Sequence, residues 1–129
     1  MKTSELIGPA LDWAVAKAQG WTDYPTDSIE QGSKWHCDPE NTPFGRVMWK
    51  DHFTPSTNWA QGGPIIEREG LGLRVHCTEN GKITSWASEL EWPMTPDKGA
   101  CGPTPLVAAM RCFVASKLGD EVEIPEELC

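Results

Sequence analysis

Residues 71–90 read LGLRVHCTENGKITSWASEL and contain the clearest secondary-structure pattern of the chain. Apolar side chains occupy every second position from Leu71 to Cys77, which is typical of a strand with one buried face. Asn80-Gly81 separates this run from a second one at 83–90, and both residues tolerate positive φ. The stretch therefore predicts a type I′ β-hairpin. We also predict a neighbouring strand from Ile65 to Arg68.

A helix is predicted before the hairpin, within residues 4–19, where apolar side chains recur on one helical face. It either begins near Gly8 with Pro9 at its first position, or follows a turn from Thr3 that is kinked at Pro9. We favour the first alternative. Gly20 supplies a C-terminal stop.

The helix predicted after the hairpin has the best-defined ends in the sequence. Thr104 suits the N-cap, Pro105 suits the first helical position, and Gly119 ends the apolar stripe. Between the elements, 20–43 and 52–63 have loop compositions, with short strands expected at Lys34–Cys37 and Gly45–Trp49. We predict an α+β fold, with a small antiparallel sheet, one helix near each end and long loops, as a single domain over residues 1–129.

The composition restricts the partners of the protein. The formal charge of −8 and the absence of a basic stripe disfavour duplex DNA and other duplex nucleic acid. No apolar segment approaches the roughly 20 residues needed to cross a membrane, and no signal peptide is recognised. The five Cys have no regular spacing, which fits a reducing compartment. We therefore expect an intracellular protein.

The chain contains seven Trp against one Tyr and three Phe. Trp side chains could supply much of a small core, or they could stack on planar groups in a pocket. STNWAQGGPIIER at 56–68 combines a Trp, two amides, a Gly pair and a cation, which is a composition typical of a ligand-binding loop. We predict ligand binding by six residues, namely Asn58, Trp59, Gln61, Gly62, Gly63 and Arg68. The alternative is a tight corner with a buried Trp.

Two other groups of residues are weaker candidates. Free N–H groups near Gly102–Pro105 could bind an anion, but capping by Thr104 is the better interpretation, and Arg111 is expected to lie too far along the helix to contribute. His36-Cys37 and His76-Cys77 suggest zinc. Each dipeptide on a strand offers only one ligand to a common site, which leaves the set short of four unless Cys101, His52 or another chain contributes.

Signatures of enzymes are missing from the sequence. It contains no GxSxG, no GxxxxGK[ST], no GxGxxG and no HExxH motif. The carboxylates at 67, 69, 89 and 91 are expected on solvent faces of strands. We therefore predict a non-catalytic protein that needs no cofactor and no metal.

Three blocks of sequence resemble the phage NinX family. They are ALDWAVAKA at 10–18, STNWAQGGPIIERE at 56–69 and GPTPLVAAMRCFVASKLGDEVEIP at 102–125. The family comprises small proteins of the nin region of lambda-like phages and prophages. The resemblance implies a phage protein that acts in the host bacterial cytoplasm, and it implies neither a mechanism nor site residues.

These observations lead to two hypotheses of function. In the first, a phage accessory protein binds a small planar or anionic ligand, such as a nucleotide signal of a host anti-phage defence, and a homo-oligomer could place loops of two chains around it. In the second, the net charge and the acidic tail at 121–127 steer the protein to a basic protein partner, which it modulates.

Overall fold

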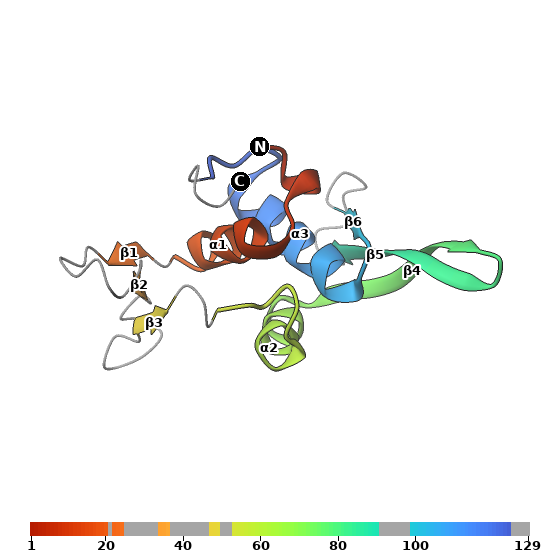
Figure 1. The fold of residues 1–129 in the computed structure, drawn as a ribbon, viewed down its shortest axis with the longest axis horizontal. Helices are drawn as coiled ribbons and strands as arrows, with labels where there is room; N and C mark the ends of the chain where they lie inside the picture. The colour runs from red at the N-terminus through yellow and green to blue at the C-terminus, as the bar shows by residue number, and fades with distance from the viewer. Residues whose placement is uncertain (21, 25–33, 37–46, 50–52, 91–98, 125–129) are drawn as a thin grey trace.

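The computed structural model describes residues 1–20, 22–24, 34–36, 47–49, 53–90 and 99–124. Its helical elements are the 3₁₀ turn η1 (Thr3–Glu5) and the α-helices α1 (Gly8–Ala18), α2 (Trp59–Glu69) and α3 (Pro105–Leu118). Its strands are β1 (Thr22–Tyr24), β2 (Lys34–His36), β3 (Val47–Trp49), β4 (Leu71–Glu79), β5 (Lys82–Leu90) and β6 (Ala100–Gly102). Figure 1 shows α3 at the centre of the helices, beside the sheet that contains β4, β5 and β6.

The antiparallel sheet has the order β4-β5-β6, and the expected α+β fold with a helix near each end is confirmed. Its hairpin turns at Asn80 and Gly81, whose φ angles of 52° and 78° are both positive, as a type I′ turn requires. A second three-stranded antiparallel sheet has the order β1-β2-β3. The strands expected at Lys34–Cys37 and Gly45–Trp49 are present as β2 and β3, whereas β1 and β6 were not predicted.

Helix α1 begins as the favoured alternative predicts. Gly8 is its first residue, Pro9 lies in its first turn, and η1 precedes it as a separate turn. Gly20, with φ 86°, follows its end. Pro9 is tolerated because the first N–H groups of a helix have no intrahelical acceptor in any case.

Helix α2 corrects the sequence prediction, because 52–63 was expected as a loop and Ile65–Arg68 as a strand. The Asn58 side chain caps this helix by accepting a hydrogen bond from the Ala60 amide at 2.9 Å. Gly70 ends it in the left-handed conformation, with φ 67°. Both caps can be recognised from the local sequence. Gly62, Gly63 and Pro64 between them have the lowest helix propensities, and for this reason a loop was predicted.

The packing of Gly62 explains why a helix forms despite this composition. A Cβ on Gly62 would lie 2.5 Å from the Pro55 carbonyl oxygen and 2.6 Å from Cδ2 of Leu106 on α3. Only glycine allows the backbone of α2 to approach this closely. Ile65, one turn later, is buried in the same core. Tertiary packing therefore outweighs the poor local propensity.

Helix α3 begins and ends as predicted. The Thr104 hydroxyl accepts a hydrogen bond from the Val107 amide at 3.1 Å, Pro105 is the first residue, and Gly119 follows the last turn. Its burial is wider than the predicted single stripe. The buried residues of α3 are Leu106, Val107, Ala108, Ala109, Met110, Cys112, Phe113 and Val114.

The core gathers around α3 and contains aliphatic side chains and Phe rather than Trp. Leu6, Leu11, Val15 and Phe113 are almost completely buried in it. Trp13 and Trp86 are half-buried and Trp59 is exposed, while the side chains of the other four Trp lie outside the described part. Among the described Trp residues, Trp13 packs against this core, so Trp contributes to its margin and not to its centre.

A buried carboxylate joins α1 to the turn before α2. Asp12 is 4% exposed, and its Oδ1 accepts a hydrogen bond from the Ser56 amide at 2.9 Å. Burial raises the pKa of the Asp12 carboxyl, and contacts with Ser56 partly offset that rise. The contact of the Ser56 hydroxyl falls short of hydrogen-bond geometry, so this buried oxygen has no partner among the described residues.

The two ends of the described chain are joined next to α3. The Met1 ammonium donates to the Val122 carbonyl and the Val122 amide donates to the Met1 carbonyl, each at 3.0 Å. The Thr3 amide donates to the Asp120 carbonyl at 2.8 Å, and the Thr3 hydroxyl donates to the Gly119 carbonyl at 2.7 Å. We call these four hydrogen bonds the terminal clamp.

The two adjacent glycines of α2 provide a matched test of its packing. We expect Gly62→Ala to lower the free energy of unfolding by about 1–3 kcal/mol, because the new Cβ would overlap with Pro55 and Leu106. Gly63→Ala should have a much smaller effect, because beyond the neighbouring residues and the backbone of α2 no atom lies within 4 Å of that Cβ, and the helix preference of alanine is offset by its position before Pro64. Urea denaturation measures both, and equal effects would contradict the close approach at Gly62.

The Asp12 carboxyl should make stability depend on pH. Its folded-state pKa lies above the unfolded value of 3.8, so ionisation costs free energy only in the folded protein. This cost is absent below pH 3.8, develops as pH rises through the folded-state pKa, and is complete above it. Asp12→Asn keeps an acceptor for Ser56 without the charge. The stability of Asp12→Asn relative to wild type should therefore increase over this window in urea denaturation, and a constant difference would be contradictory.

Candidate functional site

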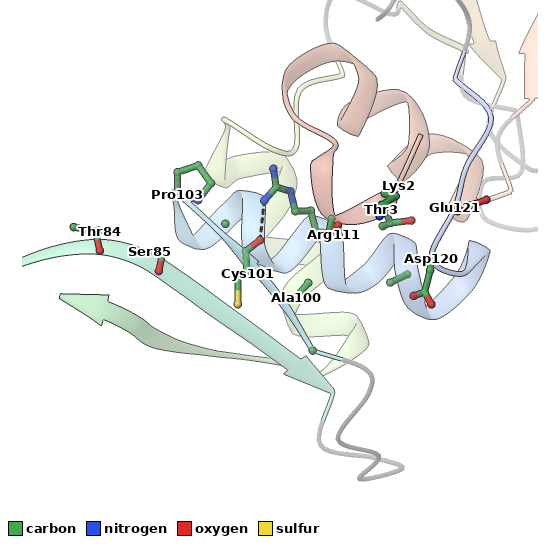
Figure 2. A pocket seen from close by; sticks show the side chains of 14 residues that line it. Lys2, Thr3, Thr84, Ser85, Ala100, Cys101, Pro103, Arg111, Asp120 and Glu121 are labelled. Carbon is green, nitrogen blue, oxygen red and sulfur yellow. Dashed lines mark hydrogen bonds between the residues drawn. The ribbon is translucent and has the colours of Figure 1, made fainter. Parts of the chain in front are cut away.

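An open pocket lies where the terminal clamp, β6 and α3 meet, and its volume is about 710 Å³. This size is within the range of about 300–1,000 Å³ that is usual for small-molecule sites. Figure 2 shows the side chains that line it. They are Lys2, Thr3, Ser4, Thr84, Ser85, Gly99, Ala100, Cys101, Gly102, Pro103, Arg111, Ala115, Asp120 and Glu121.

Arg111 is the best-positioned charged side chain in this pocket. Its Nε donates to the Leu6 carbonyl and its Nη1 donates to the Cys101 carbonyl, both at 2.8 Å. Figure 2 shows the guanidinium beside β6, with the bond to Cys101 dashed. No hydrogen bond between described residues uses Nη2. Two backbone acceptors thus fix the plane of the guanidinium and leave part of its donor capacity open.

The environment of Arg111 is short of counter-charge. Burial lowers the pKa of the Arg111 guanidinium, and the nearby Cys101 partly opposes this effect. A guanidinium still remains protonated at neutral pH. Among the described residues, no salt bridge pairs Arg111 with a carboxylate. A partly desolvated cation held by carbonyls favours an anionic ligand whose oxygen atoms accept hydrogen bonds.

The walls of the pocket add charges of both signs. Lys2 and Glu121 face each other in an isolated β-bridge, and Asp120 lies beside them in the terminal clamp. In the view of Figure 2, Asp120 and Glu121 lie on one side of Arg111, and Thr84 and Ser85 lie on the other. The pocket therefore has a cationic centre and an acidic side.

Hydroxyl groups of the pocket differ in their availability. The Thr3 hydroxyl donates to the Gly119 carbonyl, and the Thr84 hydroxyl donates to the Cys77 carbonyl at 3.3 Å. For Ser4 and Ser85, no hydrogen bond of the side chain occurs within the described part of the chain. These two hydroxyls can therefore contact a ligand without breaking an internal bond.

The backbone of β6 lies close to α3 and forms one wall of the pocket. A Cβ on Gly102 would lie 2.8 Å from the Ala108 amide nitrogen and 2.8 Å from Cγ1 of Val107. This close approach positions the Cys101 carbonyl within reach of Arg111, one and a half turns into α3. Glycine at 102 is thus a condition for the geometry of the site.

Three of the six predicted ligand-binding residues have structural roles. Asn58 caps α2, Gly62 packs against Pro55 and Leu106, and Gln61 accepts a hydrogen bond from the Thr54 amide through Oε1 at 2.8 Å. Helix formation accounts for all three contacts. None of the three lines the pocket.

The other three predicted residues lie on the surface of α2. Trp59 is 55% exposed, Gly63 has open space beside it, and Arg68 contacts Glu69 at 3.2 Å. Because Trp59 is exposed, the alternative prediction of a tight corner with a buried Trp is wrong. The six residues thus lie in α2 or at its N-cap, and none of them lines the pocket around Arg111.

The two weaker candidates have different outcomes. Thr104 caps α3 as expected, yet Arg111 reaches back to Cys101 and shares the pocket with Gly102 and Pro103, so the expectation that it lies too far away is wrong. For zinc, Cys37, His52 and the side chain of His36 lie outside the described residues. The described part contains no group of three His, Cys, Asp or Glu side chains that could hold a metal ion.

The pocket was missed because its walls come from distant parts of the sequence. Arg111 contacts Leu6 across 105 residues, and Thr3 contacts Gly119 across 116 residues. The available signal was an arginine in the middle of an otherwise apolar helix. The guanidinium of such a residue needs hydrogen-bond acceptors, and the sequence prediction related Arg111 only to the start of the helix.

Comparisons with known proteins identify the family of the chain. No helix among the described residues is long and apolar enough to cross a membrane. No curated protein matches the chain. The family model described as "Bacteriophage P22, NinX" matches residues 2–117, which include α1, α2, the sheet and most of α3. The match covers far more than half of the sequence, and the chain therefore belongs to the phage NinX family.

Proposed function

We propose that this NinX family protein binds a small anionic ligand, without catalysis, in the pocket around Arg111. The observation that carries the proposal is the fixed guanidinium, with its Nε and Nη1 bonded to backbone carbonyls and no carboxylate partner in the described part of the chain. A phosphate or carboxylate could accept from the remaining N–H groups in a planar, charge-assisted contact. Binding would also supply the missing counter-charge.

The acidic side of the pocket narrows the class of ligand. Asp120 and Glu121 would repel a ligand that is anionic throughout, but they would accept hydrogen bonds from hydroxyl or amino groups. Lys2 beside them would limit that repulsion. A ligand with one anionic end and a donor-rich remainder therefore fits best, and a nucleotide has this chemistry.

The hypothesis that the ligand contains a planar group stacked on an aromatic ring has less support in this pocket. None of the described lining residues is aromatic, so a base would not stack on a ring there. The proposal therefore concerns the phosphate and the donor groups of a nucleotide-like ligand. Sequestration of a nucleotide signal of host defence, in the bacterial cytoplasm, remains the biological role that we propose for such binding.

Ligand binding is testable with the purified protein and a panel of free phosphate and mono-, di- and cyclic nucleotides. We expect thermal shift and calorimetry to detect at least one member. Lys2→Glu should weaken its binding by on the order of tenfold, because the substitution reverses a charge in the pocket wall. Lys2 is preferable to Arg111 for this test, because Arg111 also contributes to folding through Leu6 and Cys101.

Lys117→Glu provides the matched control, since it makes the same charge change on α3 outside the pocket, where Lys117 lies 3.8 Å from Glu69. Its effect on binding should be much smaller than that of Lys2→Glu. If no member of the panel binds, or if both variants weaken binding equally, the pocket is not the site.

The exposure of Trp59 supports a second candidate function, in which the protein modulates a basic host or phage protein. An exposed Trp is a frequent anchor at protein interfaces. The net charge of −8, with Glu121 and Glu123 near the end of the described chain, would steer a basic partner to the protein.

Trp59→Ala separates the two candidate functions. It should leave binding in the pocket unchanged, because Trp59 does not line the pocket. Partners can be identified by a pull-down from infected cells and then titrated one by one. Trp59→Ala should weaken the binding of a basic partner by roughly 1–2 kcal/mol or more. Loss of nucleotide binding in this variant would instead favour the originally predicted site on α2.

A further inference from the structure

One face of α3 forms a wall of the pocket around Arg111. Ala115, one turn after Arg111, also lines the pocket, and Asp120 follows just beyond the end of the helix. At a rise of about 1.5 Å per residue, Arg111 and Leu118 are roughly 10 Å apart along the helix axis. Figure 2 shows Arg111 and Asp120 correspondingly separated among the lining side chains. A free phosphate bound at Arg111 would therefore not reach Asp120, whereas a longer ligand could contact both.

The Asp120 carboxylate differs from that of Glu121 in its surroundings. Glu121 lies directly opposite Lys2 in the isolated β-bridge, where cross-strand side chains are neighbours. Asp120 lies beside Thr3, whose amide donates to the Asp120 carbonyl. Within the described part of the chain, no salt bridge involves the Asp120 side chain. Both carboxylate oxygens of Asp120 are thus available as acceptors for a ligand.

Small side chains line the pocket between these two charged groups. Between Arg111 and Asp120, α3 contributes Ala115 to the lining, and the methyl group of this residue is half-buried. Gly99 and Ala100 line the pocket as well and are equally small. A molecule can therefore extend from one charged group to the other. It needs an anionic group at one end and adjacent hydrogen-bond donors at the other.

Among the common bases, guanine presents the edge that best complements a carboxylate. Its N1–H and one N–H of its 2-amino group are adjacent and parallel, so they can donate to the two carboxylate oxygens together. Hypoxanthine lacks the amino group, adenine has an acceptor at N1, and xanthine has a carbonyl in place of the 2-amino group. In a nucleotide, the sugar separates this edge from the phosphate and supplies the length that the pocket requires.

We propose that the ligand of the pocket is a guanine nucleotide, an inference that rests on the proposed function of binding an anion at Arg111. The phosphate accepts from the Arg111 guanidinium, and the N1–H and 2-amino group of the base donate to the Asp120 carboxylate. Asp120 is then a specificity-determining residue. Its two charge-assisted hydrogen bonds select the base in a pocket whose described lining residues offer no aromatic ring for stacking.

Matched changes in the base and in the protein test this pairing. In calorimetry, the wild-type protein should bind guanosine monophosphate (GMP) roughly tenfold more tightly than the inosine, adenosine or xanthosine monophosphate. Asp120→Asn replaces one acceptor by an amide donor, and this pair of groups complements the N1–H and carbonyl of xanthine. The variant should therefore prefer xanthosine monophosphate to GMP. A purely structural role of Asp120 could not produce such a reversal.

Glu121→Gln makes the same change from carboxylate to amide at the neighbouring residue and should keep the preference for GMP. Ala115→Leu places a larger side chain between the two ends of the ligand. It should weaken the binding of GMP by about tenfold and that of free phosphate much less. No excess of GMP over the other nucleotides in the wild type, or an unchanged preference in Asp120→Asn, overturns this inference alone. Binding of neither phosphate nor any nucleotide overturns the proposed function as well.

Discussion

The burial of α3 on almost every side is the constraint on which the other elements depend. Its central turns contact α1, the sheet and α2, so its small residues decide how closely each of them can approach. Ala108 and Ala109 are fully buried. Two glycines of neighbouring elements pack closely against this helix, Gly102 against the α3 backbone and Gly62 against Leu106. Two close approaches of backbone to helix thus place β6 and α2.

The same constraint creates the candidate site. Arg111 lies between the buried residues Met110 and Cys112, so its guanidinium must reach the edge of the core to find hydrogen-bond acceptors. These acceptors are the Leu6 and Cys101 carbonyls, which lie near because η1 and β6 approach α3. The guanidinium is therefore oriented by the packing of apolar residues. A ligand would find it already in place, without the cost of ordering a flexible side chain.

Elements with local signals could be predicted from the sequence, and elements with tertiary causes could not. The hairpin at Asn80-Gly81, the start of α1 at Gly8 and both ends of α3 follow from turn and cap chemistry within a few residues. Helix α2 has equally good caps, but its Gly-Gly-Pro centre is helical because of contacts with Pro55 and Leu106. The pocket is still less accessible to sequence reasoning, since residues 2–4, 99–103 and 120–121 meet only after α3 is packed.

Arg111 has two roles that cannot be separated by its own substitution. Its bonds to Leu6 and Cys101 join η1 to β6, and these are the two walls between which a ligand would lie. Removal of the guanidinium would leave two carbonyls without their donors and would also remove the charge that attracts an anion. A loss of binding in such a variant would therefore say little about recognition. Lys2, which is exposed in the wall beside η1, changes the field of the pocket without removing either bond, so its substitution is the better test of recognition.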